Sequence, residues 1–175
     1  MSGLMHWKYF WIFWLGGLAV FAMLVVTSGP LMTDVAPQGI LDHQSATTAE
    51  RVNAIQASWA ALGQINYAKW SMIGDLVFIG LYMSGGIIGG RLIWQEARSP
   101  SLKKLGLFCV VAYFLFGAFD YTETISQIIQ LLQNNGSDLL AGIAGFCQPL
   151  KSLSFVAGTI GMIAALIWRR SESRA

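Results

Sequence analysis

Four long apolar runs constrain this chain more than any other feature of its sequence. They cover about residues 9–31, 68–94, 105–131 and 148–168. Each run is long enough to cross a hydrocarbon layer of ~30 Å as a helix, which takes about 20 apolar residues. Because 55% of the residues are apolar and only 11% are charged, an ordinary soluble domain is excluded. The sequence therefore predicts an all-α, polytopic membrane protein, with residues 1–175 forming one domain built on a four-transmembrane-helix bundle.

The first outer loop, between the first two predicted spans, contains a further helical pattern at about residues 48–64. Thr47 and Glu50 have the spacing of a capping box, which marks the start of a helix. The apolar residues that follow recur at helical intervals: Val52, Ile55, Trp59 and Leu62. This pattern predicts an amphipathic helix that lies on the outer membrane surface or caps the bundle.

The basic residues predict how the chain is oriented in the membrane. Most of them lie on the N-terminal tail, the second loop and the C-terminal tail, which share one side if there are four spans: Lys8, Arg91, Arg98, Lys103, Lys104, Arg169, Arg170 and Arg174. Basic loops stay in the cytoplasm, so we predict that both termini are cytoplasmic. Seven of the nine acidic residues lie toward the opposite side. The net charge of +2 is explained by this topology and needs no nucleic-acid partner.

Asp120 and Glu123 lie inside the third predicted span. At 1.5 Å per residue from Leu105, Asp120 is expected about 22 Å into the layer, within roughly 8 Å of its outer boundary. The same counting places Asp75, in the second span, and Lys151, in the fourth, near that boundary. Ionisable groups from three helices are therefore expected together in the outer-leaflet half of the membrane.

The spacing of these residues also predicts which way they face. In the third span Asp120, Glu123, Thr124 and Gln127 stand at i, i+3, i+4 and i+7, so they form one polar stripe that should turn inward. Three carboxylates against Lys151 leave a formal charge of −2, which a low-dielectric site disfavours unless carboxyls are protonated or a cationic ligand is bound.

We predict a site in which Asp120 and Glu123 act on the ligand. The predicted ligand-binding residues are Asp75, Tyr82, Tyr113, Thr124, Gln127 and Lys151, the two tyrosines because each stands seven residues from an aspartate. The alternative is a structural polar network that locks the helices together.

Four glycines in the second span, within SGGIIGGR, predict a close helix contact. Gly85 and Gly89, and Gly86 and Gly90, have the G-x-x-x-G spacing that lets a neighbouring backbone approach. The contact is expected within the bundle or between the protomers of a homo-oligomer.

No metal or cofactor is predicted from the sequence. His6 and His43 fall on opposite sides of the membrane, which disfavours a shared haem or metal site. Cys109 and Cys147 are expected some ~30 Å apart and form no C-x-x-C pair. The chain also lacks a glycine-rich phosphate loop.

Two family resemblances follow from these motifs. GDLVFIGLY, FDYTET and QPLKSL together resemble a family of bacterial four-helix membrane proteins with an intramembrane Asp, an Asp-x-x-Glu-Asn/Thr motif and a following Lys. This resemblance covers roughly residues 60–168 and implies a bacterial inner-membrane location without an activity. More faintly, the chain resembles emopamil-binding and sterol-isomerase membrane domains, which bind cationic amphiphiles or isomerise sterols. Asp75 would match the second-helix acid of that family, but Thr27 and Ser28 stand where it carries an aspartate.

Three classes of function remain open from the sequence. The preferred one is an acidic polar pocket in the outer-leaflet half that binds a lipid or cationic amphiphile, and transforms it if the protein is an enzyme. The second is a non-catalytic accessory or assembly subunit of a larger membrane complex. The third is a small proton- or cation-coupled transporter.

Overall fold

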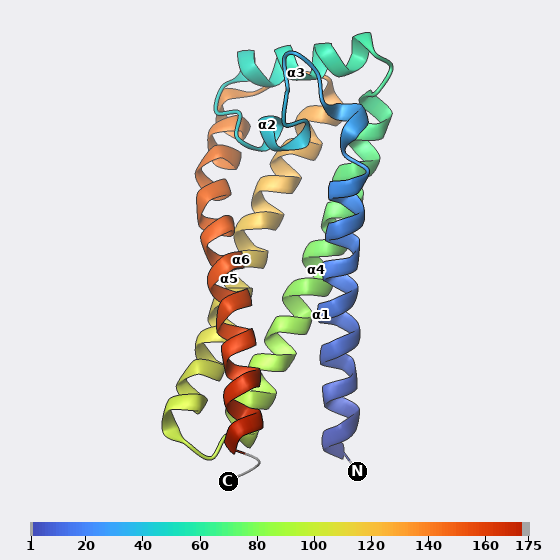
Figure 1. Ribbon diagram of the computed structural model, residues 1–175. Helices are drawn as coiled ribbons and strands as arrows, with labels where there is room; N and C mark the ends of the chain where they lie inside the picture. Colours follow the sequence, from blue (N-terminus) through green and yellow to red (C-terminus); the bar gives the residue numbers. More distant parts are fainter. Residues whose placement is uncertain (1, 173–175) are drawn as a thin grey trace. The chain divides into compact units, whose positions relative to one another are not determined.

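The computed structural model describes residues 2–172, and this part of the chain contains helices and no strand (Figure 1). Four helices are long and apolar enough to cross a membrane. They are α1 (Ser2–Val26), α4 (Ile65–Glu96), α5 (Pro100–Gln133) and α6 (Asp138–Glu172). The predicted all-α fold class with four membrane spans is confirmed.

The end of α1 differs from the apolar window that predicted it. The helix ends at Val26, although the window continues to residue 31. The hydroxyls of Thr27 and Ser28 donate hydrogen bonds back to carbonyl oxygens of the preceding turn, each at 2.8 Å. Pro30 then follows in the short 3-10 helix η1 (Gly29–Leu31) and cannot donate a helical hydrogen bond. Hydropathy does not register these local bonds, whereas the other three helices contain their predicted windows and continue past both ends.

The predicted loop helix is present as α3 (Ala49–Ala61), preceded by the short α2 (Ile40–Gln44). Its N-cap is Thr48, whose side chain accepts a hydrogen bond from the backbone N–H of Arg51 at 3.2 Å. The predicted capping residue, Thr47, is therefore wrong by one position. Two consecutive threonines offer the same capping chemistry, so the choice between them depends on backbone conformation, and Thr48 has the extended conformation that an N-cap needs.

The inward face of α3 is also shorter than predicted. Val52, Ile55 and Trp59 are buried, whereas Leu62 is 59% exposed. The helix ends at Ala61, so Leu62 no longer follows the helical spacing that would turn it inward.

The chain divides into two compact units. The first comprises the residues up to Leu18, Ile79–Ala118 and the residues from Lys151 on, and the second comprises Ala19–Phe78 and Phe119–Leu150. The second unit therefore contains the first and third loops, together with seven of the nine acidic residues and two of the eleven basic ones. The charge asymmetry noted in the sequence is thus also an asymmetry between the two units.

In the first unit, glycines on α4 allow close packing against the neighbouring helices. A Cβ atom at Gly85 would lie 2.5 Å from the backbone nitrogen of Trp14 in α1, and one at Gly86 would lie 2.1 Å from the ring of Tyr113 in α5. The other two glycines of the pattern are also buried against this chain: Gly89 and Gly90. The glycine pattern thus serves packing within the chain. A homo-oligomer contact through the same four glycines stays a prediction.

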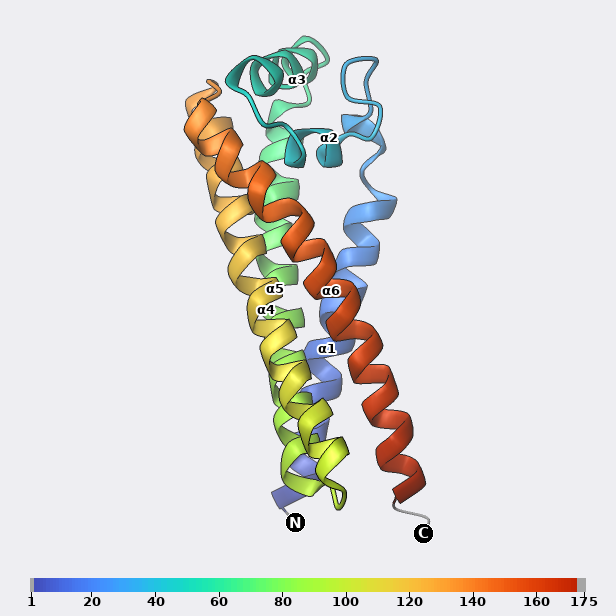
Figure 2. The same cartoon turned by 90° about the vertical axis from the view of Figure 1, so that its left-hand side faces the viewer.

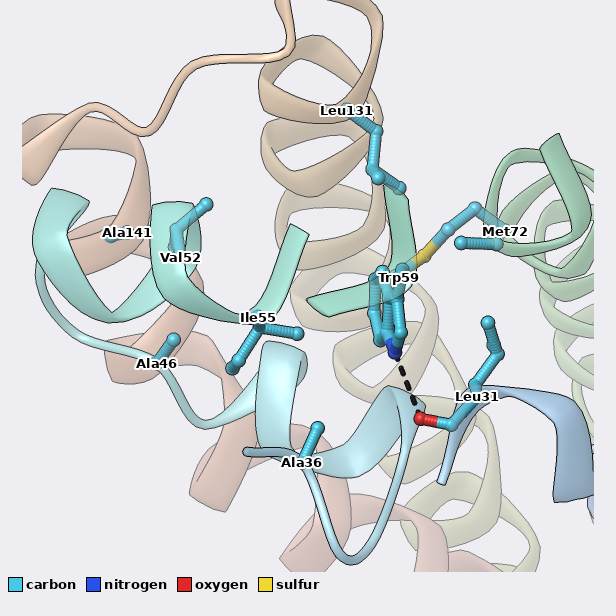
Figure 3. Close-up of a cluster of buried hydrophobic side chains, with 10 residues drawn as sticks. Leu31, Ala36, Ala46, Val52, Ile55, Trp59, Met72, Leu131 and Ala141 are labelled. Carbon is cyan, nitrogen blue, oxygen red and sulfur yellow. Dashed lines mark hydrogen bonds between the residues drawn. The ribbon is translucent and has the colours of Figure 1, made fainter. Parts of the chain in front are cut away.

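In the second unit, α3 covers the core (Figures 1 and 2). Trp59 is fully buried, and its indole N–H donates a hydrogen bond to the carbonyl oxygen of Leu31 at 2.8 Å (Figure 3). The core around it takes side chains from α3, α4, α5, α6 and the loop before α3: Leu31, Ala36, Ala46, Val52, Ile55, Trp59, Ala68, Met72, Leu131 and Ala141. The loop helix thus packs on the core of the second unit, and its position relative to the membrane surface stays a prediction.

Two further contacts tie α3 to the connection between α5 and α6. The backbone N–H of Ala49 donates to the Asp138 carboxylate at 2.7 Å, and the backbone N–H of Gly136 donates to the Asn53 side chain at 2.6 Å. Both ends of α3 are thus fixed within the second unit: the start by these bonds and the end by Trp59. The side chains that α3 and α2 direct inward consequently have defined positions.

Candidate polar site

The polar stripe of α5 is buried in the second unit. Asp120 and Gln127 are each 1% exposed, and Glu123 and Thr124 are fully buried. Their i, i+3, i+4 and i+7 spacing places them on one side of the helix. The prediction that this stripe turns inward is confirmed.

Asp75 of α4 joins this stripe. The hydroxyl of Thr124 donates a hydrogen bond to the Asp75 carboxylate at 2.9 Å. This hydrogen bond fixes the orientation of the Asp75 side chain toward α5. The structure thus brings together Asp75 of the second predicted span and Thr124 of the third.

Gln127 extends the stripe toward the loop helices. Its side-chain nitrogen lies 3.5 Å from Oε1 of Glu123. On its other side it lies close enough to His43 to act on the pKa of that imidazole. Gln127 therefore connects the carboxylates of α5 to a residue of α2.

His43 is 1% exposed and faces Gln56 of α3, which is 5% exposed. The two side-chain Nε2 atoms lie 3.2 Å apart. Burial lowers the pKa of His43 to about 4, while the neighbouring Gln127 acts weakly in the opposite direction. His43 is therefore neutral at pH 7, and it is a hydrogen-bonding group of the second unit, not a charged one.

The sequence reasoning used His43 only to exclude a metal site and did not select Gln56. A signal for Gln56 was present, because it stands beside Ile55 and three residues before Trp59 and so falls on the buried face of α3. Gln130 was also missed. Its side chain is fully buried and accepts a hydrogen bond from the backbone N–H of Ser137 at 3.0 Å, so it fixes the turn between α5 and α6.

Tyr82, Tyr113 and Lys151 belong to the first unit. There the Trp14 indole donates to the hydroxyl of Tyr113 at 2.7 Å, and Tyr113 donates to Tyr82 at 3.4 Å. Tyr82 in turn shares a hydrogen bond with Thr159. This chain of bonds joins segments of all four long helices, which gives both tyrosines a structural role. Contact of Tyr82, Tyr113 or Lys151 with a ligand stays a prediction.

The second unit carries few positive charges to balance its carboxylates. Its two basic residues are Arg51 and Lys69, and the guanidinium of Arg51 lies 3.8 Å from the carboxylate of Asp42. Acidic residues therefore outnumber basic ones in this unit, seven to two.

Metal binding and cysteine chemistry have little support among the residues that the structure describes. Among residues 2–172, no three His, Cys, Asp or Glu side chains are grouped so that they could hold a metal ion. Cys109 and Cys147 are buried, lie in different units and form no disulfide.

Comparisons of the chain with protein-family models, with curated proteins and with solved structures found no match. Both family resemblances stay predictions, and the functional argument depends on the residues of this chain alone.

Proposed function

We propose that this chain is a multi-pass membrane protein that binds a lipid or a cationic amphiphile at the polar site of the second unit. In this proposal Asp120 and Glu123 hold the ligand. The observation that carries it is the burial of both carboxyls, at 1% and 0% exposure, on an apolar helix long enough to span a membrane. A charged side chain deep in a membrane costs roughly 2.5–3.5 kcal/mol on insertion scales, so such residues are usually retained for a function.

The charge of the site favours a cationic ligand. Asp75, Asp120 and Glu123 contribute three carboxylates, and Lys151 is the one predicted counter-charge. A bound cation offsets the remaining negative charge in a low-dielectric environment. In this proposal Thr124 keeps Asp75 in place, and the amide of Gln127 adds a neutral hydrogen-bonding group beside Glu123.

We place the site in the outer-leaflet half of a bacterial inner membrane, with both termini in the cytoplasm. The clustering of basic residues on the second loop and the terminal segments supports this orientation. Labelling of Ser45→Cys and Ser101→Cys tests it, because both positions are exposed while the native thiols are buried. Ser45→Cys should react from outside and Ser101→Cys from the cytoplasm; the reverse result would overturn the orientation and the leaflet together.

The proposal also allows the site to be catalytic, with a buried carboxyl acting on the bound ligand. A buried carboxyl beside other carboxyls can hold its proton at neutral pH and then act as a general acid. Asp120→Asn would then abolish turnover and leave the fold intact. A variant with normal turnover would remove Asp120 from the mechanism.

The proposal is tested by native mass spectrometry of the mildly solubilised protein. The wild type is compared with Asp120→Asn/Glu123→Gln, and with Asp34→Asn as an exposed carboxylate control in the same unit. We expect a small molecule on the wild type and on the control, and its loss from the double variant. The same molecule on all three proteins would place its binding elsewhere. Other polypeptides as the only bound species would instead support an accessory subunit.

A further inference from the structure

Most basic residues of the first unit gather at one end of it, where α1 begins, α4 leads into α5 and α6 ends (Figure 1). Hydrogen bonds tie these segments together. The Trp7 indole N–H donates to the Glu96 carboxylate at 2.9 Å, and the Arg169 guanidinium donates to the same carboxylate at 2.8 Å. The backbone N–H of Arg98 donates to the Glu172 carboxylate at 3.0 Å. Both acidic residues of the first unit therefore have partners of their own.

This end of the unit carries more positive charge than its two carboxylates balance. Seven basic residues of the described chain lie here: Lys8, Arg91, Arg98, Lys103, Lys104, Arg169 and Arg170. Against Glu96 and Glu172 they leave a formal excess of five positive charges. Arg91 and Lys103 are exposed, and their side chains form no hydrogen bond or ion pair within residues 2–172. These two side chains are therefore available to a ligand.

Helix packing places Arg91 and Lys103 on the same side of the α4–α5 pair. The two helices are antiparallel and meet closely, because a Cβ at Gly90 would lie 2.7 Å from the carbonyl oxygen of Gly106. At 3.6 residues per turn, Arg91 is rotated by about 100° from Gly90, and Lys103 by about 60° from Gly106. In an antiparallel pair of right-handed helices both rotations lead to the same side. Glu96 is rotated by about 120° from Gly90 the other way, so its carboxylate faces away from Arg91.

The depth of Arg91 in α4 favours an anionic partner. Arg91 lies about 7.5 Å along the axis before the helix ends at Glu96. Trp94 stands about one turn closer to that end and is 50% exposed, and tryptophan is enriched at the level of the lipid headgroups. Arg91 is thus on the hydrocarbon side of the headgroups. A charged side chain there reaches back to the interface or pairs with an opposite charge, and a lipid phosphate provides both.

The surface next to these charges is apolar. Leu107 and Phe114 stand four and eleven residues after Lys103, so they lie on its side of α5. Leu107 is 54% exposed and Phe114 is 59% exposed. Both belong to a helix that is long and apolar enough to span a membrane, where such side chains contact acyl chains. A lipid matches both the charges and this surface, whereas free phosphate matches only the charges.

We propose that Arg91 and Lys103 bind the phosphate of an anionic phospholipid whose acyl chains lie along Leu107 and Phe114. The Arg91 guanidinium can hold two phosphate oxygens at once, and the Lys103 ammonium adds a second positive charge. A zwitterionic phospholipid also carries a cation, which the excess positive charge of this end repels, so the site prefers a lipid with net negative charge. The site lies in the first unit and takes a ligand of the opposite charge, so it is independent of the proposed amphiphile site.

The test compares two lipids with the same acyl chains, dioleoylphosphatidylglycerol and dioleoylphosphatidylcholine. Each is titrated into the full chain in mild detergent, and native mass spectrometry measures the dissociation constants. We expect phosphatidylglycerol to bind at least about tenfold more tightly, since each basic residue near an anionic lipid contributes a factor of about five. Glycerophosphoglycerol, which is the same headgroup without acyl chains, should not bind at the concentration at which phosphatidylglycerol saturates.

Two double variants assign the preference to the site. Arg91→Gln/Lys103→Gln should reduce the preference for phosphatidylglycerol by at least about tenfold. Lys8→Gln/Lys104→Gln is the matched control, because it removes two exposed charges from the same end of the unit. Lys104 is turned by about 100° from Lys103 around α5, and Lys8 is on α1. The control should therefore keep at least about a third of the wild-type preference.

Four results would overturn this inference. Equal affinity of the wild type for the two lipids would show that the site does not select net negative charge. A preference that persists in Arg91→Gln/Lys103→Gln would place the lipid elsewhere. An equal loss in both double variants would indicate diffuse attraction by the whole basic end. Binding of glycerophosphoglycerol as tight as that of the lipid would identify a soluble phosphodiester as the partner.

Discussion

Replacing Gly86 with alanine is predicted to destabilise the first unit by about 1–3 kcal/mol. An added Cβ would lie 2.1 Å from ring carbons of Tyr113, whereas carbon atoms in ordinary contact are about 3.5–4.0 Å apart. The ring must therefore move by more than about 1 Å to accept the methyl group. Tyr113 is 1% exposed and its hydroxyl is held by the Trp14 indole at 2.7 Å, so it has little room for this movement.

The predicted magnitude combines three effects. Overpacking a filled core costs about 1–3 kcal/mol, and a displaced buried hydrogen bond costs about 0.5–1.5 kcal/mol more. Alanine is better than glycine in a helix by up to about 1 kcal/mol, which offsets part of this cost. The net effect is a loss of about 1–3 kcal/mol in the free energy of unfolding.

Equilibrium unfolding by SDS in mixed micelles, followed by circular dichroism, measures this loss. Gly16→Ala is the matched control, because within the described part of the chain no atom of a neighbouring element lies within 4 Å of its added Cβ. This variant should be neutral or slightly stabilised. In a Tyr113→Leu background, the cost of Gly86→Ala should fall by at least about 1 kcal/mol, as expected for two groups in direct contact. Equal stability of the Gly86→Ala and Gly16→Ala proteins would refute the packing argument.

Three further predictions concern the second unit. Trp59→Phe should lower its stability by about 1–3 kcal/mol because the carbonyl of Leu31 loses its buried donor; an unchanged thermal midpoint in detergent would contradict this. The pKa of His43 is lowered to about 4 from the ordinary 6.5, so the unfolded chain binds the proton more readily than the folded one. Stability should be full above about pH 6.5 and fall as the pH drops toward 4, by about 1.4 kcal/mol at pH 5.5; His43→Gln should remove this part of the pH dependence, and a pH profile shared by both proteins would argue against it. Gly136→Ala would place a Cβ 2.5 Å from the carbonyl oxygen of Ala49 and should cost about 1–3 kcal/mol in the same assay, so wild-type stability in this variant would show that the connection between α5 and α6 can shift freely.

The sequence predicted the parts of this fold that depend on periodicity within one helix. The four spans follow from runs of apolar residues, and the inward face of α5 follows from the spacing of Asp120, Glu123, Thr124 and Gln127. Such patterns are local, so they can be seen without knowing what the helix packs against.

The features of the fold and site that the sequence did not predict depend on local hydrogen bonds and on contacts between distant segments of the chain. At the end of α1 the side-chain hydroxyls of Thr27 and Ser28 donate hydrogen bonds to backbone carbonyls of the preceding turn, which hydropathy does not include. The contact of His43 with Gln56 depends on the path of the loop between α1 and α4, and no spacing in the sequence specifies that path. The polar site was therefore predictable on the side of α4 and α5. The spacing within α3 also indicated that Gln56 is buried, but its contact with His43 of α2 was visible only in the structure.

The central claim is that the buried carboxylates serve a ligand and not the stability of the fold. Glu123→Gln tests this most directly, because the substitution keeps the side-chain shape and removes one negative charge from a site with an excess of carboxylates. The measurement is the thermal unfolding midpoint of the ligand-free protein in mild detergent, with Asp34→Asn as the exposed control. Our account predicts an unchanged or higher midpoint for Glu123→Gln, as is common when a functional group that strains the fold is neutralised. A midpoint clearly lower than those of the wild type and the control would show that Glu123 is structural, and it would contradict the account.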